Sequence, residues 1–167
     1  MKTVRFSLLL ALLLAAPLWA LDDDSEQPIA VEADSLELRE QENISIYEGN
    51  VRLTQGSLEI NSDRLVIHFN DAGDLELMEM TGAPARLRRL DDEQQEMRGQ
   101  ARRINYREAE SVLELLQEAR FSHAGDTIEG HRIRINTEDN SIQAGSADTD
   151  ERVKMLIQPR KNTDSQD

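Results

Sequence analysis

Apolar and polar residues alternate along most of this chain, and this period of two constrains the fold more than any other feature. The alternation first runs through Ile29 and Val31, Leu36 and Leu38, Ile44 and Ile46, Val51 and Leu53, Leu58 and Ile60, and Leu65 and Ile67. It resumes at Leu75 and Leu77, Ala85 and Leu87, Ile104 and Tyr106, Ala119 and Phe121, Ile133 and Ile135, and Val153, Met155 and Ile157. Alternate side chains of a strand point to opposite faces, so the pattern predicts strands with one dry face and one wet face. Turn-forming residues such as Gly49-Asn50 and Gly125-Asp126 separate the runs, which favours an all-β fold.

Two stretches leave a helical alternative open. Residues 87–103 and 107–118 contain strong helix formers and could be read as helices. We expect the second stretch to be a hairpin with its turn near residues 107–111, because it falls within an internal repeat.

The repeat appears when the sequence is shifted by 68 residues. Apolar positions then coincide: Ala33 with Ala101, Leu36 with Ile104, Leu38 with Tyr106, Ile44 with Val112, Leu53 with Phe121, Ile60 with Ile128, Leu65 with Ile133, and Ile67 with Ile135. Any alternating pattern matches itself at an even offset, but turns and the pairs Arg52 with Arg120 and Arg64 with Arg132 also coincide. The sequence therefore predicts two copies of one β unit, stacked so that each buries the apolar face of the other.

The N-terminus has the pattern of a secretion signal. Lys2 and Arg5 precede a leucine-rich stretch that ends at Ala20, and acidic residues follow directly. We expect residues 1–20 to be a cleaved signal peptide, residues 21–159 to form one domain, and residues 160–167 to be a disordered tail. An uncleaved membrane anchor is the alternative. An exported chain without cysteine must be stable without disulfides.

Charge and motif content exclude several classes of function. Acidic residues number 33 against 19 basic ones, for a formal net charge of −14, and no basic stripe is present. Such a chain repels phosphate backbones, so nucleic-acid binding is not expected. The sequence has no HExxH or GxSxG motif and no phosphate-binding glycine loop, so the common hydrolase and nucleotide-binding signatures are absent.

Few residues are candidates for chemistry. They are His68, His123 and His131, and the carboxylate pairs Asp91 with Asp92 and Glu138 with Asp139. A three-histidine metal site is one possibility, but His68 and His123 alternate with apolar neighbours and are expected on the solvent side of strands. The carboxylates could act in acid–base catalysis, but in so acidic a chain we expect a solvated face. We therefore expect no metal, no cofactor and no enzymatic activity.

The dry face is mostly Leu, Ile and Val, with Tyr106 and Phe121 as its main aromatic residues. Such residues can fill an ordinary sandwich core, or they can line an open groove that holds the hydrocarbon part of a ligand. Periodicity does not separate these two possibilities.

Several segments resemble the OstA-like family of lipopolysaccharide transport proteins, and in particular its small periplasmic members. They are QPIAVEAD at 27–34, YEGNVRLTQGSLEINSDRLVI at 47–67, GAPA at 82–85, GQA at 99–101, Tyr106, and AGDTIEGHRIRI at 124–135. The resemblance extends from about residue 27 to residue 159. The chain departs from the family pattern at 116–119, where LQEA stands in place of the glycine and asparagine expected in the second repeat.

The resemblance implies a twisted, open β-jelly roll, with two antiparallel sheets enclosing an apolar groove. It also implies molecules joined end to end into a periplasmic bridge that carries lipopolysaccharide from the inner to the outer membrane. The partners would be the lipid A part of lipopolysaccharide, an anchored inner-membrane component, an outer-membrane barrel component, and further copies of this chain. A groove is useful because moving one acyl chain of about twelve carbons into water costs on the order of 10 kcal/mol.

Two sets of residues follow from the resemblance and the alternation. Expected to line the groove are Ile29, Val31, Leu36, Leu38, Ile46, Val51, Leu53, Leu58, Ile60, Leu65, Ile67, Leu77, Leu87, Ile104, Tyr106, Phe121 and Ile135. Expected in edge strands that pair with a neighbouring molecule are Ile29, Ala30, Val31, Val153, Met155 and Ile157. The alternatives are a carbohydrate-binding or adhesive β-module, and a hydrolase that uses a carboxylate pair.

Overall fold

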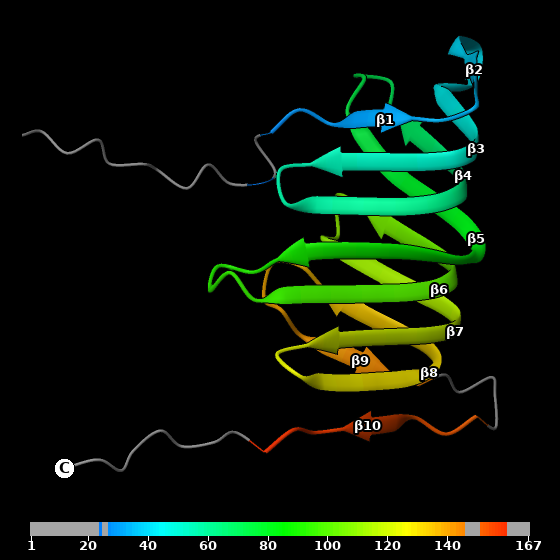
Figure 1. The fold of residues 1–167 in the computed structure, drawn as a ribbon. Coiled ribbons are helices and arrows are strands. Elements are labelled where there is room, and N and C mark those ends of the chain that lie inside the picture. Colours follow the sequence, from blue (N-terminus) through cyan, green and yellow to red (C-terminus); the bar gives the residue numbers. More distant parts are fainter. Residues whose placement is uncertain (1–23, 25–26, 146–150, 160–167) are drawn as a thin grey trace, which may run out of the picture.

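The computed structural model describes residues 24, 27–145 and 151–159, and most of them belong to one antiparallel sheet (Figure 1). The strands are β1 (Ala30–Glu32), β2 (Ser35–Arg39), β3 (Ile44–Gln55), β4 (Leu58–Phe69), β5 (Leu75–Leu90), β6 (Glu96–Arg107), β7 (Val112–His123), β8 (Asp126–Asn136), β9 (Ile142–Ala144) and β10 (Lys154–Leu156). A 3-10 turn, η2 (Glu40–Glu42), separates β2 from β3. No helix in the described ranges has the length and apolar character needed to cross a bilayer. The expected signal peptide (1–20) and C-terminal tail (160–167) lie outside the described residues.

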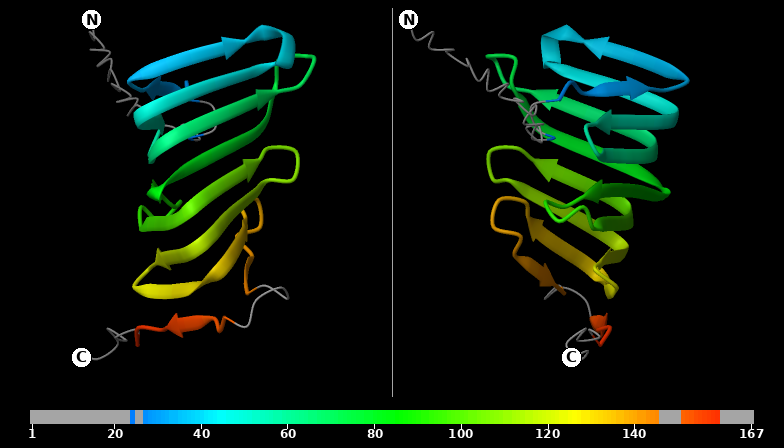
Figure 2. Two further views of the ribbon diagram at one scale, coloured as in Figure 1. Left: turned by 90° about the vertical axis from the view of Figure 1, so that its right-hand side faces the viewer. Right: turned by 60° about the vertical axis from the view of Figure 1, so that its left-hand side comes forward.

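The sheet folds over on itself into two layers. Register shifts interrupt the pairings of β3 through β8 near the middle of each strand, between Glu48 and Val51 in β3 for example. One half of each long strand lies in a layer that begins with β1 and ends with β10. The other half lies in a layer bordered by β2 and β9. We call these the β1 layer and the β2 layer; Figure 2 shows the stack from two sides, with blue β1 and β2 at one end and red β10 at the other.

The predicted all-β, twisted antiparallel architecture is confirmed, and the structure refines its two sheets. They are two layers of one hydrogen-bonded sheet, because each long strand turns the corner and continues into the other layer. Bulges make this possible, since an extra residue bends a strand without ending its pairing with the neighbours. The helical alternative for 87–103 and 107–118 is wrong: these residues lie mainly in β5, β6 and β7, and β6 and β7 form the expected hairpin.

The bend requires unusual backbone at the end of the sheet near β1. Gly49 has φ +80° and Asn50 has φ +47°, and a Cβ on Gly49 would lie only 2.3 Å from the Asp34 carboxylate. Glycine is therefore needed at position 49. At the same step of β7, Gln117 and Glu118 also take positive φ, 64° and 55°, although the sequence has no glycine or asparagine there.

Small residues occupy the inside of the bend. Ala85, Ala101 and Ala119 are 0–2% exposed and belong to the buried core. Larger side chains are accommodated farther from the bend, where Leu53 and Leu65 are each 1% exposed. The interior between the layers therefore widens from the bend towards the hairpin turns. We call the open side of the fold, where the hairpin turns of both layers lie, the mouth.

Strand pairings recur at the offset found in the sequence. Leu53 pairs with Ile60 and Phe121 pairs with Ile128; both pairs lie in hairpins that shift register at equivalent points. The duplication of one ancestral unit stays a prediction, but the recurrence of the register is a property of the sheet.

Candidate functional site

Two rows of inward-facing residues cross the molecule from end to end, one in each layer. In the β1 layer, successive strand partners are Val31, Leu53, Ile60, Leu87, Gly99, Phe121, Ile128 and Met155. In the β2 layer they are Leu36, Tyr47, Leu65, Met80, Ile104, Leu115, Ile133 and Ala144. Every position but Gly99 carries an apolar or aromatic side chain, so the interior is one continuous apolar strip.

The middle of this strip is closely packed. Met80, Ile104 and Leu115 are fully buried. Gly99 lies where the layers approach each other: a Cβ there would be 3.0 Å from Leu115 Cδ2 and 3.1 Å from Leu87 Cγ. The backbone hydrogen bonds of the paired strands run within each layer, so side-chain contacts hold the layers together in the middle of the strip.

Polar and charged groups gather at the mouth. His123 is paired with Asp91 at 2.6 Å, and Arg89 lies 3.5 Å from the Asp24 carboxylate. Burial raises the pKa of Tyr106, and the nearby charge of Glu108 raises it further. The mouth therefore presents a half-buried phenol and charged groups beside an apolar interior.

Most residues expected to line a groove are in this interior. Nine belong to the buried core: Val51, Leu53, Ile60, Leu65, Ile67, Leu87, Ile104, Phe121 and Ile135. Val31, Leu58 and Tyr106 pack against it and are partly exposed. Leu36 and Leu38 pair with Tyr47 and Ser45 at the edge of the β2 layer and are 52% and 61% exposed, and Ile29, next to β1, is 42% exposed. Their contact with lipid stays a prediction.

Two of the expected lining residues face the other way. Ile46 pairs with Val66, and Leu77 pairs with His68; these partners alternate with Leu65 and Ile67 of the core. The expectation that Ile46 and Leu77 face the interior is therefore wrong. Ile46 is still 5% exposed, because it is flanked by charged neighbours such as Glu48 and Arg64, whose side chains form an ion pair at 3.0 Å.

Sequence reasoning also missed residues of the interior. They are Tyr47, Met78, Met80, Leu113, Leu115 and Ile133. The 68-residue offset could have supplied Ile133, because it aligns with Leu65. Met78 and Met80 carried no clear signal, because Leu75 and Leu77 offer a competing alternation in the same segment.

The two ends of the sheet expose apolar side chains. Large exposed hydrophobic residues in the described part of the chain are Ile29, Leu36, Leu38, Ile142, Val153, Met155, Leu156 and Ile157. Each lies in, or next to, one of the terminal strands β1, β2, β9 and β10. The expected edge residues Ala30, Val31 and Met155 lie in β1 and β10, with Ile29, Val153 and Ile157 beside them. Pairing with a partner stays a prediction.

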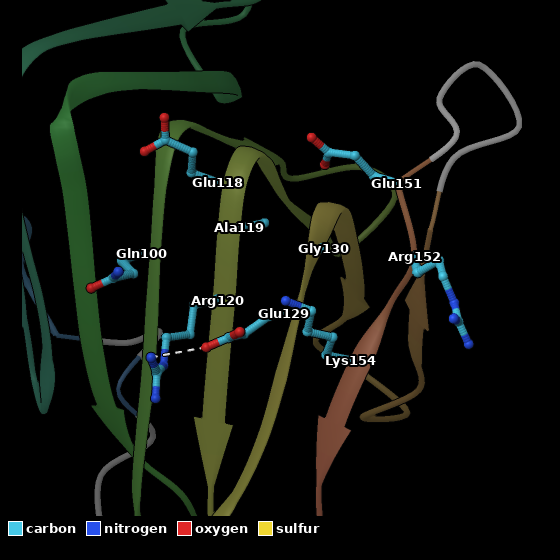
Figure 3. A pocket seen from close by; sticks show the side chains of 9 residues that line it. All are labelled: Gln100, Glu118, Ala119, Arg120, Glu129, Gly130, Glu151, Arg152 and Lys154. Carbon is cyan, nitrogen blue, oxygen red and sulfur yellow. Dashed lines mark ion pairs between the residues drawn. The ribbon is translucent and has the colours of Figure 1, made fainter.

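A hollow near the β10 end has a different character (Figure 3). It is lined by Gln100, Glu118, Ala119, Arg120, Glu129, Gly130, Glu151, Arg152 and Lys154. Arg120 and Glu129 pair across its floor at 2.9 Å. Its charged lining separates it from the apolar interior.

The histidines and carboxylates are dispersed. His68, His123 and His131 pair with three different carboxylates, those of Glu79, Asp91 and Glu151. Within the described ranges, no group of three or more potential metal ligands occurs. His68 faces outward as expected. His123 lies on the same strand face as Phe121, which was not expected, but at the mouth its side chain is still 37% exposed to solvent.

The carboxylates considered as catalytic candidates stabilise turns by accepting backbone hydrogen bonds. Asp91 accepts backbone N–H bonds from Glu93 and Gln95, and Asp139 accepts one from Ser141. The His123 contact and these backbone bonds lower the pKa of Asp91, and the bonds from Ser141 lower the pKa of Asp139. Carboxylates held ionised in this way organise loops and are poor proton donors near neutral pH.

The outer face of the β2 layer carries a buried ionic cluster. Glu114, 4% exposed, accepts hydrogen bonds from Arg107 at 3.0 Å and from Arg132. Burial alone would raise the pKa of Glu114, but these two guanidinium groups hold it below its usual value. The cluster fixes β6, β7 and β8 from outside and leaves the interior free of charge.

Aromatic residues do not form an exposed platform in the described part of the chain. Phe121 is buried in the core, and Tyr47, Phe69 and Tyr106 pack against it. Sugar-binding surfaces rely on exposed rings, so the structure gives the carbohydrate-binding alternative no support.

Comparisons with known proteins agree with this geometry. Residues 30–141 match the family model described as LptA/(LptD N-terminal domain) LPS transport protein. The lipopolysaccharide export system protein LptA of Escherichia coli K12 is 32% identical over 170 residues, covering 98% of this chain and 91% of that protein. The export system protein LptH of Pseudomonas aeruginosa is 30% identical over 149 residues, covering 85% of each.

The fold is similar to a solved relative as well. The crystal structure of LptH from P. aeruginosa, described as the LptA-homologous periplasmic component of the conserved lipopolysaccharide transport device, superposes with a TM-score of 0.74. The match covers 81% of this chain and 99% of LptH, at 28% identity. The extent of these matches, together with the folded sheet and its apolar interior, shows that this chain belongs to the LptA/(LptD N-terminal domain) family of lipopolysaccharide transport proteins.

Proposed function

We propose that this protein is a periplasmic bridge component that carries lipopolysaccharide from the inner to the outer membrane, with the acyl chains between its two layers. The observation that carries the proposal is the pair of apolar rows that cross the molecule without interruption and emerge at both ends of the sheet. An ordinary core is closed at its ends, whereas this one leaves apolar side chains exposed there.

Acyl chains enter by separation of the layers at the mouth. The middle of the interior is filled, with Met80 and Ile104 fully buried, so lipid must replace contacts between the layers. Replacing apolar side-chain contacts by acyl chains keeps hydrocarbon out of water, so the hydrophobic free energy changes little. The hydrogen bonds within each layer persist during this opening, and the bend serves as the hinge.

Molecules join end to end by edge-strand pairing. Terminal strands have unpaired backbone groups, and their exposed apolar side chains need cover. Adding a strand of a second molecule satisfies both needs and extends the interior into the next molecule. The end partners in the membranes are an anchored inner-membrane component and an outer-membrane barrel component, and residues 1–20 direct export before they are removed.

The acidic charge lies outside the strip and keeps the bridge soluble while repelling headgroups from surfaces other than the mouth. Glu114 and Glu59 are held by arginines on the outer faces, and the hairpin turns carry further carboxylates such as Asp91 and Asp139. If lipid binding depended strongly on salt while self-association did not, the charges would act directly on the ligand.

A photocrosslinking amino acid at Tyr106 tests lipid capture in cells. We expect lipopolysaccharide to be crosslinked at Tyr106, because this side chain faces inward at the mouth. The matched control is Leu77, an apolar residue on the outer face of the neighbouring strand β5. Equal capture at the two positions, or none at Tyr106, would contradict the proposal.

Charge placed in the interior provides a second test. Leu53→Asp and Leu87→Asp should reduce lipid loading while the protein is still secreted, because a carboxylate in the strip must be desolvated beside the acyl chains. Circular dichroism on the purified variants confirms that the sheet persists. Unchanged loading of both folded variants would remove these two residues from the lipid path.

A further inference from the structure

We propose that end-to-end association repeats, between two molecules, the pairing that β5 and β6 make within one. In this arrangement β10 of one molecule pairs antiparallel with β1 of the next, with Met155 opposite Val31 and Lys154 opposite Glu32. The inference rests on the proposed bridge and adds its register and one ion pair.

The end of the sheet near β1 has the pairing of an interior strand. Val31 pairs with Leu53 of β3, and Gly99, 68 residues later, pairs with Phe121 of β7. The strand β1 therefore occupies the place that β6 has in the middle of the sheet. In the middle, β6 has β5 on its other side, whereas no strand in the described ranges pairs with the same side of β1.

The opposite end of the sheet, at β10, also has the pairing of an interior strand. Ile60 of β4 pairs with Leu87 of β5, and Ile128 of β8 pairs with Met155 of β10 at the same offset. The strand β10 thus occupies the place of β5, and among the described strands it has no neighbour where β5 has β6. Each end of the molecule therefore lacks the strand that the other end supplies.

The register follows from the existing β5–β6 pairing. Leu87 lies opposite Gly99, which places Met155 opposite Val31 of the next molecule. Arg86 lies opposite Gln100, which places Lys154 opposite Glu32. In the described part of one molecule, neither Lys154 nor Glu32 has an ion-pair partner, and both side chains are exposed.

The β2 layer closes in the same way. Ile142 of β9 pairs with Ile135 as Met78 of β5 pairs with Ile67, although here the offset is 64 residues. Because Met78 lies opposite Tyr106, the equivalent step places Ile142 opposite Leu38 of the next molecule. Both inner rows then continue across the junction, and exposed residues from both layers are covered together.

Cysteine pairs test the register, and the chain has no cysteine to interfere. Molecules carrying Met155→Cys are mixed with molecules carrying Val31→Cys, oxidised with copper phenanthroline, and compared with the out-of-register partner Ala33→Cys. Directly opposite residues have Cβ atoms about 4.5–5.5 Å apart, so we expect at least fivefold more crosslinked dimer with Val31→Cys. Equal yields, or a higher yield with Ala33→Cys, would overturn the register.

Sedimentation velocity of the unmodified protein separates this result from failure of the bridge. Association with crosslinking at another register would overturn only the present inference. Absence of association at every concentration tested would overturn both the inference and the end-to-end part of the proposed function.

Charge reversal tests the ion pair. Lys154→Glu alone and Glu32→Lys alone should each weaken association by about twofold to fivefold, because like charges then face each other across the junction. An equimolar mixture of the two variants should associate like the unmodified protein, since every mixed junction again joins opposite charges. Arg86→Glu, in the same row but in the middle of the sheet, is the control and should have no effect. No recovery in the mixture would overturn the assignment of this pair.

Discussion

The two ends of the sheet are built differently, although both expose apolar residues. At one end only Ala33 and Asp34 separate β1 from β2, and Asp34 fixes the corner through a 2.8 Å hydrogen bond from Asn50 and a backbone bond from its own N–H to Gly49. At the other end residues 145–153 lie between β9 and β10; β10 has three pairs with β8, as β1 has with β3, but β9 has three where β2 has five. The short connection at Asp34 fixes β1 and β2 relative to each other, so we expect the end of the sheet near β1 to be the more firmly preformed of the two.

The largest expected effect comes from a substitution that disrupts the end of the sheet near β1. Gly49→Ala puts a Cβ against Asp34 at a backbone conformation of φ +80°, and should lower the free energy of unfolding by about 2 kcal/mol. Gln117→Ala, at the equivalent step of β7, should change it by less than about 0.5 kcal/mol. Urea unfolding of both variants makes the comparison, and equal losses would show that the end near β1 is not specially constructed.

Exposed apolar residues provide the next test. Leu36→Glu and Met155→Glu should each weaken self-association at least tenfold, which corresponds to about 1.4 kcal/mol, because each side chain becomes buried only in the assembly. Thermal unfolding of the monomer should change little, since both residues are more than half exposed. If only one variant weakened association in sedimentation, the two ends would not be partners of each other.

Substitution of one carboxylate at each end of the sheet compares how firmly the two ends are held. Asp34→Ala should lower the free energy of unfolding by about 1 kcal/mol, because it removes the bond from Asn50 at a corner of the sheet. Asp126→Ala removes the acceptor for the Gln158 N–H and should only release β10. Hydrogen exchange at residues 154–158 should accelerate in Asp126→Ala and stay unchanged in Asp34→Ala; the reverse pattern would contradict the comparison.

The smallest effect is a pH dependence near the β1 end. Hydrogen bonds from Asn61 and Arg88, together with the charges of Arg52 and Arg88, lower the pKa of Glu59 to about 2. Its folded pKa is below the usual 4.5, so its contribution to stability is present above pH 4.5 and is lost as the pH falls towards 2.

The equivalent position in the second half is Thr127, which does not titrate in this range. The unmodified protein should melt at a higher temperature than Glu59→Gln at pH 7, and the difference should shrink at pH 2.5. A difference that stayed constant between these two pH values would show that the Glu59 charge does not stabilise the sheet.

The sequence supports the fold well and the site in part, and particular residues show why. Regular alternation correctly predicted that Leu53, Ile60, Leu65 and Ile67 face the interior, because no bulge interrupts the short runs in which these residues occupy every second position. It misplaced Ile46, because the inward-facing residues of β3 are Tyr47, Val51 and Leu53 on both sides of the bulge, whereas the apolar alternation of Ile44 and Ile46 falls on the opposite face.

The same limit applies to β5. In Leu75 to Met80 two interleaved alternations compete, and the pairing of β5 with β4 and β6 selects Met78 and Met80 for the interior. Composition could not show that the two layers are one sheet, since a strand that turns a corner and two separate strands have the same local pattern. The 68-residue offset carried the long-range information, because its register recurs in the paired strands.

The continuous ladder has a consequence for size. Each molecule contributes eight strands to the path from β1 to β10, and neighbouring strands lie about 4.8 Å apart. A bridge that adds molecules strand against strand therefore grows in steps of about 38 Å, and its length is quantised. If the chain assembles in this way, two membranes spanned by the assembly would be held at a separation set by a whole number of copies.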